Sequence, residues 1–148
     1  MIFVTVGSYK YDELIEEIDK MPIKEEVIMQ IGRGEYIPKN CTWYRYKPSI
    51  LPDIKNARLV VSHEGATTLL QAANEHKPMI VKENPHTIKN PGIILKMEKE
   101  GYLWYCREHN DLWYLISIAD EHKFKKYTKP KCTIGQIIND HMRWEWNG

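Results

Sequence analysis

The stretch LVVSHEGATTLLQAANEHKPMIV, residues 59–81, decides the fold of this chain. It reads as an apolar strand (59–62), a small-residue turn (63–65), a helix (66–76) and a second apolar strand (79–81). A strand, helix and strand in this order form one βαβ unit of a parallel sheet. The first turn of such a helix faces the carboxyl edge of the sheet, where its N–H groups and dipole favour a phosphate. A nucleotide or nucleotide-sugar site is therefore the first hypothesis.

Gly65 in the turn is open to a second interpretation. Every parallel α/β domain needs tight turns between strands and helices, and glycine provides them without any ligand. The turn matches neither the glycine-rich dinucleotide fingerprint nor a Walker A loop. The local pattern therefore leaves both a phosphate site and a plain turn open.

The other apolar runs alternate between strand and helix patterns. Strands are predicted at 2–6, 27–31, 41–46 and 102–105, and helices at 11–21, 48–56, 91–100 and 111–122. Continuous apolar runs indicate strands that are buried on both faces, whereas the helices show an apolar stripe opposite charged residues. The alternation predicts an α/β fold with a Rossmann-like, doubly wound parallel sheet and right-handed crossovers.

Composition excludes several classes of protein. With 148 residues, 43% of them hydrophobic, the chain can bury the core of one compact domain. A formal net charge of +1 shows no basic excess, so nucleic acid is not an expected partner. The three cysteines lack CxxC spacing and the six histidines lack metal-ligand spacing, so we expect no metal, disulfide framework or cofactor.

The length of the apolar runs bears on the location of the protein. None approaches the roughly 20 residues that span a bilayer, and the first residues read as a strand instead of a secretory signal. We therefore expect a cytoplasmic protein with free thiols. Any association with a membrane would need a partner or a surface patch.

Residues 123–148 differ from the predicted nucleotide-sugar-binding domain at 1–122. The segment 123–131 is basic, 133–142 has a weak helical pattern, and the chain ends with two tryptophans in RWEW at 143–146. We expect this basic and aromatic extension to pack either on its own domain or on a partner.

Ligands of doubly wound sheets bind beyond the carboxyl ends of the strands, where the strand order reverses. The loops 7–11, 32–38, 46–50 and 62–68 follow predicted strands. We expect the site to lie among these loops.

Several motifs resemble the family 28 glycosyltransferases. They are MIFVTVG at 1–7, YDEL at 11–14, QIG at 30–32 and NARLVVSHEGATTLLQAANEHKPMIV at 56–81. More narrowly, the chain is similar to the soluble donor-binding subunit of two-component enzymes that transfer a sugar from a UDP-sugar to a lipid-linked acceptor. These include the dolichol-pathway N-acetylglucosamine transferase and bacterial exopolysaccharide pairs. The similarity covers roughly residues 1–105, and SHEGATTLLQA is its most specific part.

The resemblance implies the C-terminal lobe of a two-lobed (GT-B) glycosyltransferase. It implies a hexosyltransferase that works only with a membrane-anchored subunit, which holds the lipid-linked acceptor and the general base. The chain would then reach the membrane peripherally, through that partner. No DxD pair that could hold a metal on a diphosphate is present, which favours a metal-independent transfer.

The resemblance also implies a set of donor-binding residues. They are Gly7, Ser8, Tyr46, Lys47, Ser62, His63, Gly65, Ala66, Thr67, Thr68, Gln71 and Asn90. Thr68 stands where the family has a hydroxyl that meets the donor diphosphate, and Tyr46 and Lys47 match the step that brackets uracil. Thr67 or Thr68 could instead cap the helix, and His63 could be a structural histidine.

The chain also departs from the family pattern. Gln71 replaces a glutamate that accepts two hydrogen bonds from the ribose, and only Asn90 remains of an Asn-His-Gln triplet. Lys82 replaces a proline, and Glu64 places a negative charge beside the expected anion site. These departures leave open a degenerate, non-catalytic subunit that regulates a transferase. An unrelated α/β nucleotide-binding or hydrolytic domain is the third hypothesis, although no Gly-x-Ser-x-Gly elbow is present.

Overall fold

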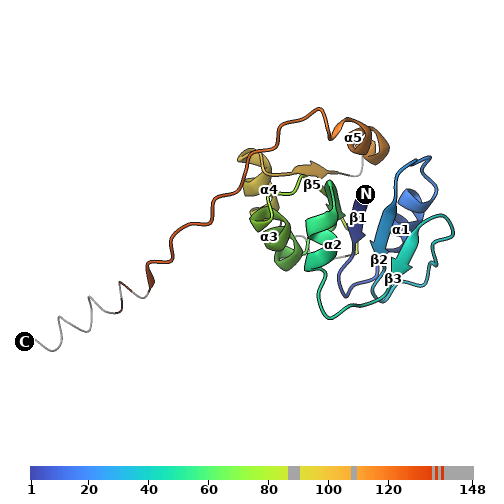
Figure 1. The fold of residues 1–148 in the computed structure, drawn as a ribbon, viewed down its shortest axis with the longest axis horizontal. Coiled ribbons are helices and arrows are strands. Elements are labelled where there is room, and N and C mark those ends of the chain that lie inside the picture. The colour runs from blue at the N-terminus through green and yellow to red at the C-terminus, as the bar shows by residue number, and fades with distance from the viewer. Residues whose placement is uncertain (87–90, 108–109, 135, 137, 139–148) are drawn as a thin grey trace, which may run out of the picture.

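The computed structural model describes residues 1–86, 91–107, 110–134, 136 and 138, which form a parallel sheet with helices on both faces (Figure 1). The strands are β1 (Ile2–Thr5), β2 (Val27–Gln30), β3 (Thr42–Tyr44), β4 (Leu59–Ser62), β5 (Met79–Lys82) and β6 (Trp104–Cys106). They form one six-stranded sheet in the order β3-β2-β1-β4-β5-β6. Every pairing is parallel, so the predicted α/β class and the doubly wound sheet are confirmed.

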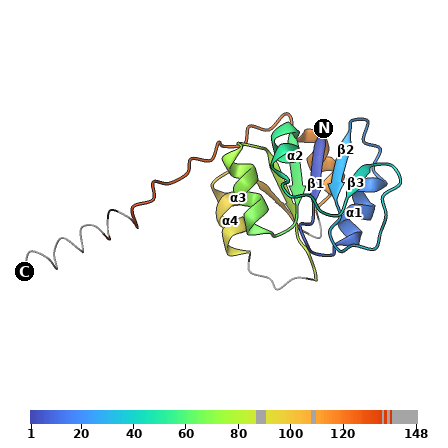
Figure 2. The same cartoon turned by 60° about the horizontal axis from the view of Figure 1, so that its bottom comes forward.

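Five helices cover the two faces of the sheet. They are α1 (Asp12–Asp19), α2 (Leu51–Asn56), α3 (Ala66–Asn74), α4 (Gly92–Lys99) and α5 (Leu112–Ile118). One apolar cluster joins α1 and α5 to one face, and a second joins α2, α3 and α4 to the other. Figure 2 shows α3 and α4 side by side, with α1 on the opposite flank of the sheet. Because both faces are covered, β1 and β4 are buried at every residue, as their apolar runs predict.

The edge strand β3 is shorter than the predicted run 41–46. Its ladder with β2 ends at Tyr44, since Arg45 turns away and donates to the backbone carbonyls of Gly32 (3.0 Å) and Gly34 (2.7 Å). The guanidinium therefore anchors the β2–β3 loop at the point where the strand ends.

The strand order reverses between β1 and β4. These strands are neighbours in register, with Thr5 opposite Ser62, so the loops that follow them leave the sheet side by side. This point of reversal is where a doubly wound sheet accepts a ligand.

The β2–β3 loop supports the loop that follows β1. Gly32 has a φ of +53°, and a Cβ added there would lie 2.5 Å from the Tyr9 carbonyl oxygen and 2.7 Å from that of Gly7. Next to it, the Arg33 N–H donates to the Tyr9 carbonyl (3.1 Å). The loop 32–38, which was predicted to lie at the ligand site, thus supports the loop after β1.

Buried Asp19, the last residue of α1, holds the same loop from its far end. Its carboxylate accepts hydrogen bonds from the Tyr36 hydroxyl (2.8 Å) and from the backbone N–H groups of Lys39 (2.9 Å) and Asn40 (2.8 Å). Burial alone would raise the pKa of Asp19, but these donors lower it below its ordinary value of 3.8. The carboxylate therefore stabilises the fold in its ionised form.

An Asp19→Asn variant should lose about 2 kcal/mol of unfolding free energy at neutral pH, because its amide presents hydrogens to groups that are themselves donors. Since folding lowers the pKa of Asp19, its stabilisation is complete above the unfolded value and is lost as pH falls through the folded one. Urea unfolding of the wild type and of Asp19→Asn should show that the difference between their unfolding free energies narrows below about pH 4. Glu26→Gln, at an exposed side chain, is the control, and an equal loss there would contradict the assignment.

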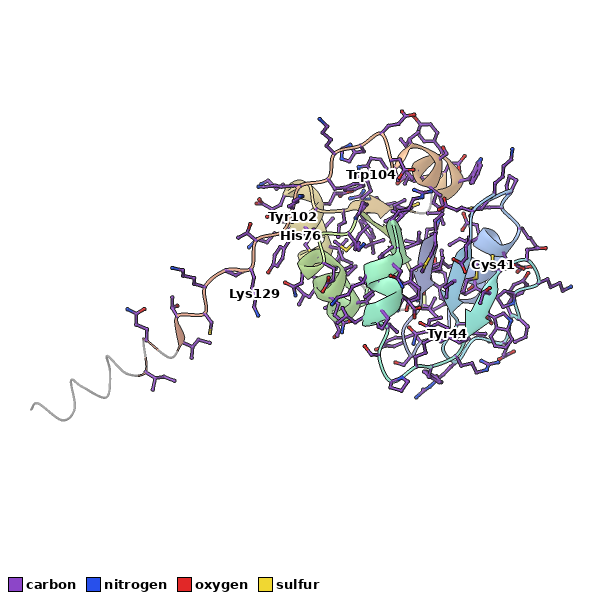
Figure 3. The ribbon with its side chains drawn as sticks, in the orientation of Figure 1. Cys41, Tyr44, His76, Tyr102, Trp104 and Lys129 are labelled. Carbon is purple, nitrogen blue, oxygen red and sulfur yellow. The ribbon has the colours of Figure 1, made fainter. Side chains whose placement is uncertain are left out.

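The segment that follows α5 returns across the end of the sheet. Phe124 packs on Trp104 (ring centroids 4.9 Å apart), Tyr127 on Tyr102 (5.6 Å), and the Lys125 N–H donates to the Gly101 carbonyl (2.9 Å). Figure 3 labels Tyr102 and Trp104 on the domain and Lys129 on the extended segment that leads away from it. Most of the predicted helix at 133–142 and both tryptophans of 143–146 lie outside the described residues. The role of the extension stays a prediction.

Within the described part of the chain, no helix is long and apolar enough to cross a membrane. The thiol of Cys41 is half-buried, that of Cys106 is buried and that of Cys132 is exposed, and all three are free. Burial raises the pKa of the Cys41 thiol to about 11 and also raises that of Cys106. Neither of these two is therefore a thiolate at neutral pH.

Candidate donor-binding site

A cavity of about 710 Å³ opens at the carboxyl edge of the sheet, between the loop after β1 and the first turn of α3. Its lining residues are Gly7, Ser8, Tyr9, His63, Glu64, Gly65, Ala66, Thr67, Thr68 and His86. The cavity lies where the strand order reverses between β1 and β4. Its position and size suit a small polar ligand.

The amino end of α3 meets the cavity with uncapped donors. Gly65 is the N-cap residue, with extended backbone angles (φ −89°, ψ 103°), and among the described residues no side chain accepts a hydrogen bond from the first turn. The hydroxyls of Thr67 and Thr68 likewise have no hydrogen-bond partner within the described residues. The alternative role for these threonines, capping their own helix, is thus not seen. The first turn keeps its N–H groups and two hydroxyls for an anion.

The loop after β1 forms the opposite wall. Gly7 has a φ of +60°, and its N–H donates to the Thr5 hydroxyl (3.0 Å), which in turn donates to Gln30 (2.6 Å). Glycine adopts this backbone conformation at little cost, which lets the chain turn sharply beside the cavity. Ser8 and Tyr9 follow the turn and are exposed. The buried Thr5–Gln30 pair therefore fixes the wall from below.

His63 joins the two walls. Its Nε2–H donates to the Val6 carbonyl (2.9 Å), and its ring packs edge-on against Tyr9, with centroids 5.4 Å apart. Nδ1 is buried and has no partner in the described part of the chain. Burial lowers the pKa of His63, which keeps the ring neutral. His63 is thus a structural histidine that also lines the cavity, with an unpaired acceptor.

Glu64 carries the acidic charge noted beside the anion site. Its carboxylate accepts a hydrogen bond from the Tyr105 hydroxyl of β6 (2.6 Å). Burial and this bond raise the pKa of Tyr105, so the hydroxyl remains a donor at neutral pH. Arg107 lies over the Tyr105 ring at 4.8 Å and pairs with Glu98 at 2.9 Å. Tyr105 therefore fixes a carboxylate at the rim of the cavity.

Some residues implied by the resemblance lie away from the cavity. Ser62 is buried and donates to the His63 carbonyl (3.2 Å). Tyr46 is exposed beyond β3, and the ammonium of Lys47 pairs with Asp53 (2.9 Å) over the Tyr44 ring. Gln71 is half-buried, one turn into α3. Asn90 lies outside the described residues.

Tyr9 and His86 line the cavity but were missed as site residues. Tyr9 falls in the predicted loop 7–11, so its position was available from the pattern. His86 stands in the loop after β5 without any motif around it. Its position depends on a contact across the fold with Glu13 of α1 (2.7 Å), in addition to a local hydrogen bond from its backbone N–H to the side chain of buried Asn84 (2.9 Å).

Lysine and arginine do not occur among the described residues that line the cavity. No group of three or more His, Cys, Asp or Glu side chains among the described residues could hold a metal ion. The donors that the described lining residues offer to a ligand are therefore backbone N–H groups, hydroxyls and imidazoles.

The comparisons with known proteins agree with this geometry. The model of the glycosyltransferase family 28 C-terminal domain matches residues 1–137, and the chain belongs to this family. It is 36% identical over 121 residues to the UDP-N-acetylglucosamine transferase subunit ALG13 of Mus musculus. That match spans 70% of this chain and 10% of the mouse protein. The Homo sapiens subunit of the same name is 34% identical over 122 residues, 71% of this chain and 11% of that protein. The chain thus spans about a tenth of the length of these relatives.

Solved structures show the same fold. The NMR solution structure of ALG13 aligns with a TM-score of 0.57 at 19% identity, over 86% of this chain and 89% of that one. The calicheamicin glycosyltransferase CalG4 aligns with a TM-score of 0.63 at 18% identity, over 81% of this chain and 33% of that one. The fold is therefore that of the C-terminal Rossmann-like domain of GT-B glycosyltransferases, as the resemblance implies.

Proposed function

We propose that this chain is the donor-binding subunit of a two-component glycosyltransferase that moves a sugar from a UDP-sugar to a lipid-linked acceptor. The observation that carries the proposal is the cavity between Gly7 and the uncapped first turn of α3. Membership of family 28 supports sugar transfer. The relatives named as UDP-N-acetylglucosamine transferase subunits support both the uridine donor and the need for a further subunit.

In the proposed complex, the donor diphosphate lies against the first turn of α3. The N–H groups of Ala66, Thr67 and Thr68 and the two threonine hydroxyls donate to phosphate oxygens, and the helix dipole adds to their attraction. Gly65 lets the backbone approach the ligand closely. Ser8 lies on the opposite wall of the cavity, facing the first turn of α3.

The nucleoside extends toward β3 in this proposal. Tyr46, exposed beyond the end of β3, offers its ring to uracil, and Asp53 holds Lys47 beside it. Gln71 keeps its role as a ribose ligand, with one amide oxygen as acceptor. Asn90 remains the proposed sugar or phosphate contact of the loop before α4.

The chemistry is a direct attack of an acceptor hydroxyl on the anomeric carbon. The bond to the new oxygen forms as the bond to the diphosphate oxygen breaks, and UDP leaves with the negative charge. The donors at the α3 turn stabilise that charge as it develops. The general base takes the proton from the acceptor hydroxyl, and we place it on the partner subunit.

The acceptor lobe defines the partner. A GT-B enzyme carries out its reaction between two lobes, and this chain aligns with a third of the CalG4 chain. We propose a membrane-anchored, acceptor-binding subunit, which holds this chain at the cytoplasmic face of the membrane. The basic and aromatic extension 123–148 is the proposed docking segment.

A non-catalytic, regulatory subunit of such an enzyme is the second candidate. Gln71, in place of the family glutamate, favours it because the amide lacks the charge that strengthens a hydrogen bond to the ribose. A chain that binds no UDP-sugar, and yet raises the transfer rate of its partner, would establish this candidate.

Thr68→Ala tests the placement of the diphosphate. Loss of one hydrogen bond to a charged phosphate should weaken UDP binding by about 1.5 to 3 kcal/mol, or roughly tenfold to a hundredfold. Calorimetric titration with UDP measures the change, with Thr128→Ala, at an exposed position of the extended segment, as the matched control. Unchanged affinity in a folded Thr68→Ala protein would place the diphosphate elsewhere.

A further inference from the structure

The segment 123–131, termed the basic strap, concentrates positive charge on one part of the surface. It contains five lysines in nine residues, and no acidic residue occurs between 123 and 134. The whole chain has a formal net charge of only +1, so the residues outside the strap are together net acidic. The charge of the strap is therefore a local feature, which the overall composition conceals.

Aromatic contacts fix the strap on the domain. Phe124 packs on Trp104, with ring centroids 4.9 Å apart, and Tyr127 packs edge-on against Tyr102 at 5.6 Å. The side chains of Phe124 and Tyr127 are both half-buried. The aromatic groups of the strap thus hold it against the domain and leave its lysines to face outward.

The lysines of the strap are largely available to a partner. Lys125 lies over the Tyr102 ring at 5.6 Å, and its ammonium is 3.7 Å from the Glu100 carboxylate. The other four are exposed and form no ion pair with any described residue: Lys123, Lys126, Lys129 and Lys131. Figure 3 shows Lys129 on the part of the segment that leads away from the domain. Four unpaired cations therefore follow one another along the strap.

We propose that the basic strap binds the surface of a membrane that contains anionic phospholipids. A lysine ammonium is a compact point charge, and a cluster of such charges suits a diffuse layer of anionic headgroups. The inference deepens the proposed function and rests on it for the presence of a membrane, because the proposed acceptor is lipid-linked. It gives the chain a membrane contact of its own, in addition to the contact through its partner.

A nucleic acid is the other polyanion that a lysine cluster can meet. Proteins that bind single strands combine positive charge with aromatic rings on which the bases stack, and arginine forks read the base edges of duplexes. The strap contains no arginine, and both of its rings pack on the domain. A lipid surface requires neither stacking nor base contacts, so these observations favour the membrane.

The strap lies apart from the proposed donor cavity. No residue of 123–131 is among the described residues that line the cavity. The strap packs on Tyr102 and Trp104, where β6 begins, whereas the cavity lies beyond the carboxyl ends of β1 and β4. Membrane binding therefore leaves the cavity open to a donor, and the two kinds of binding can be measured separately.

Co-sedimentation of the whole chain with lipid vesicles tests the inference. Vesicles of phosphatidylcholine with about 30% phosphatidylserine should carry the chain into the pellet at low salt, whereas vesicles of phosphatidylcholine alone should not. Salt at about 1 M should release the chain from the anionic vesicles, because it screens exposed charges.

Two triple variants separate the strap from net charge in general. The strap variant carries Lys126→Gln, Lys129→Gln and Lys131→Gln. It should bind the anionic vesicles about a hundredfold more weakly than the wild type, since each lysine near such a surface contributes about fivefold. The matched control loses the same charge at three exposed lysines around α1 and β2, and carries Lys20→Gln, Lys24→Gln and Lys39→Gln. It should bind nearly as well as the wild type.

Three outcomes would overturn the inference. They are the absence of wild-type binding to the anionic vesicles, an equal loss of binding in the control variant, and tighter wild-type binding to a single-stranded RNA than to these vesicles. Calorimetric titration with UDP distinguishes this inference from the proposed function, because the strap variant should keep the wild-type affinity for UDP. A wild-type chain that binds the vesicles but no UDP would overturn the proposed function alone.

Discussion

A Gly32→Ala protein is expected to lose about 3 kcal/mol or more of unfolding free energy, and with it the wall of the proposed donor cavity. A left-handed backbone such as that of Gly32 (φ +53°) costs an alanine roughly 1–2 kcal/mol. The new methyl group would also lie 2.5 Å from the Tyr9 carbonyl oxygen and 2.7 Å from that of Gly7. Both contacts are with backbone, so relief requires the loop after β1 to move.

Thermal unfolding measures the loss, which should lower Tm by roughly 10 °C. Gly65→Ala is the control, since Gly65 has a negative φ and an added Cβ would be 3.8 Å from the nearest atom, in the ring of His63. It should unfold near the wild-type temperature. If Gly32→Ala were as stable as Gly65→Ala, the support that the β2–β3 loop gives to the β1 loop would be disproved.

The second large effect is the dependence on a partner. The chain alone should transfer no sugar to a lipid-linked acceptor, although it binds the donor. Holding two reactants together lowers the activation free energy of an enzymatic reaction by roughly 7–11 kcal/mol, and one lobe holds only one of them. Transfer should therefore fall below detection without the acceptor lobe and return when the membrane fraction that contains the partner is added.

A radiolabelled UDP-sugar and an extracted lipid acceptor allow this measurement. Addition of the Thr68→Ala chain to the same membranes should restore transfer only weakly, which separates a catalytic donor site from a mere stabilising role. Full restoration by that variant would favour the regulatory subunit. Robust transfer by the isolated chain would refute the partner requirement.

The fold could be predicted from sequence because its strands are local, apolar and buried on both faces. The runs at 2–6 and 59–62 leave little choice of structure, and the helices between strands dictate a parallel sheet. The order in which the strands pair does not follow from any single run. It becomes visible only in the structure, where the strands pair in the order β3-β2-β1-β4-β5-β6.

The cavity could be predicted in part. The turns after β1 and β4 follow from the rule for parallel sheets, and both line the cavity. His86 could not be placed, because its loop has no motif and its position depends on Glu13, far away in the sequence. The supporting role of the loop 32–38 was also hidden, since it depends on tertiary contacts of Gly32 and Asp19.

The central claim is that the turn at Gly65–Thr68, together with Gly7 and Ser8, binds the diphosphate of a UDP-sugar. An NMR titration of the ¹⁵N-labelled chain with UDP tests it most directly, because backbone amides are the proposed ligands. We predict saturable shifts at Gly7, Ser8 and Gly65–Thr68, strongest in the first turn of α3. No shifts up to about 10 mM UDP, or shifts confined to the second hollow around Ile23, Arg58 and Trp113, would contradict the account.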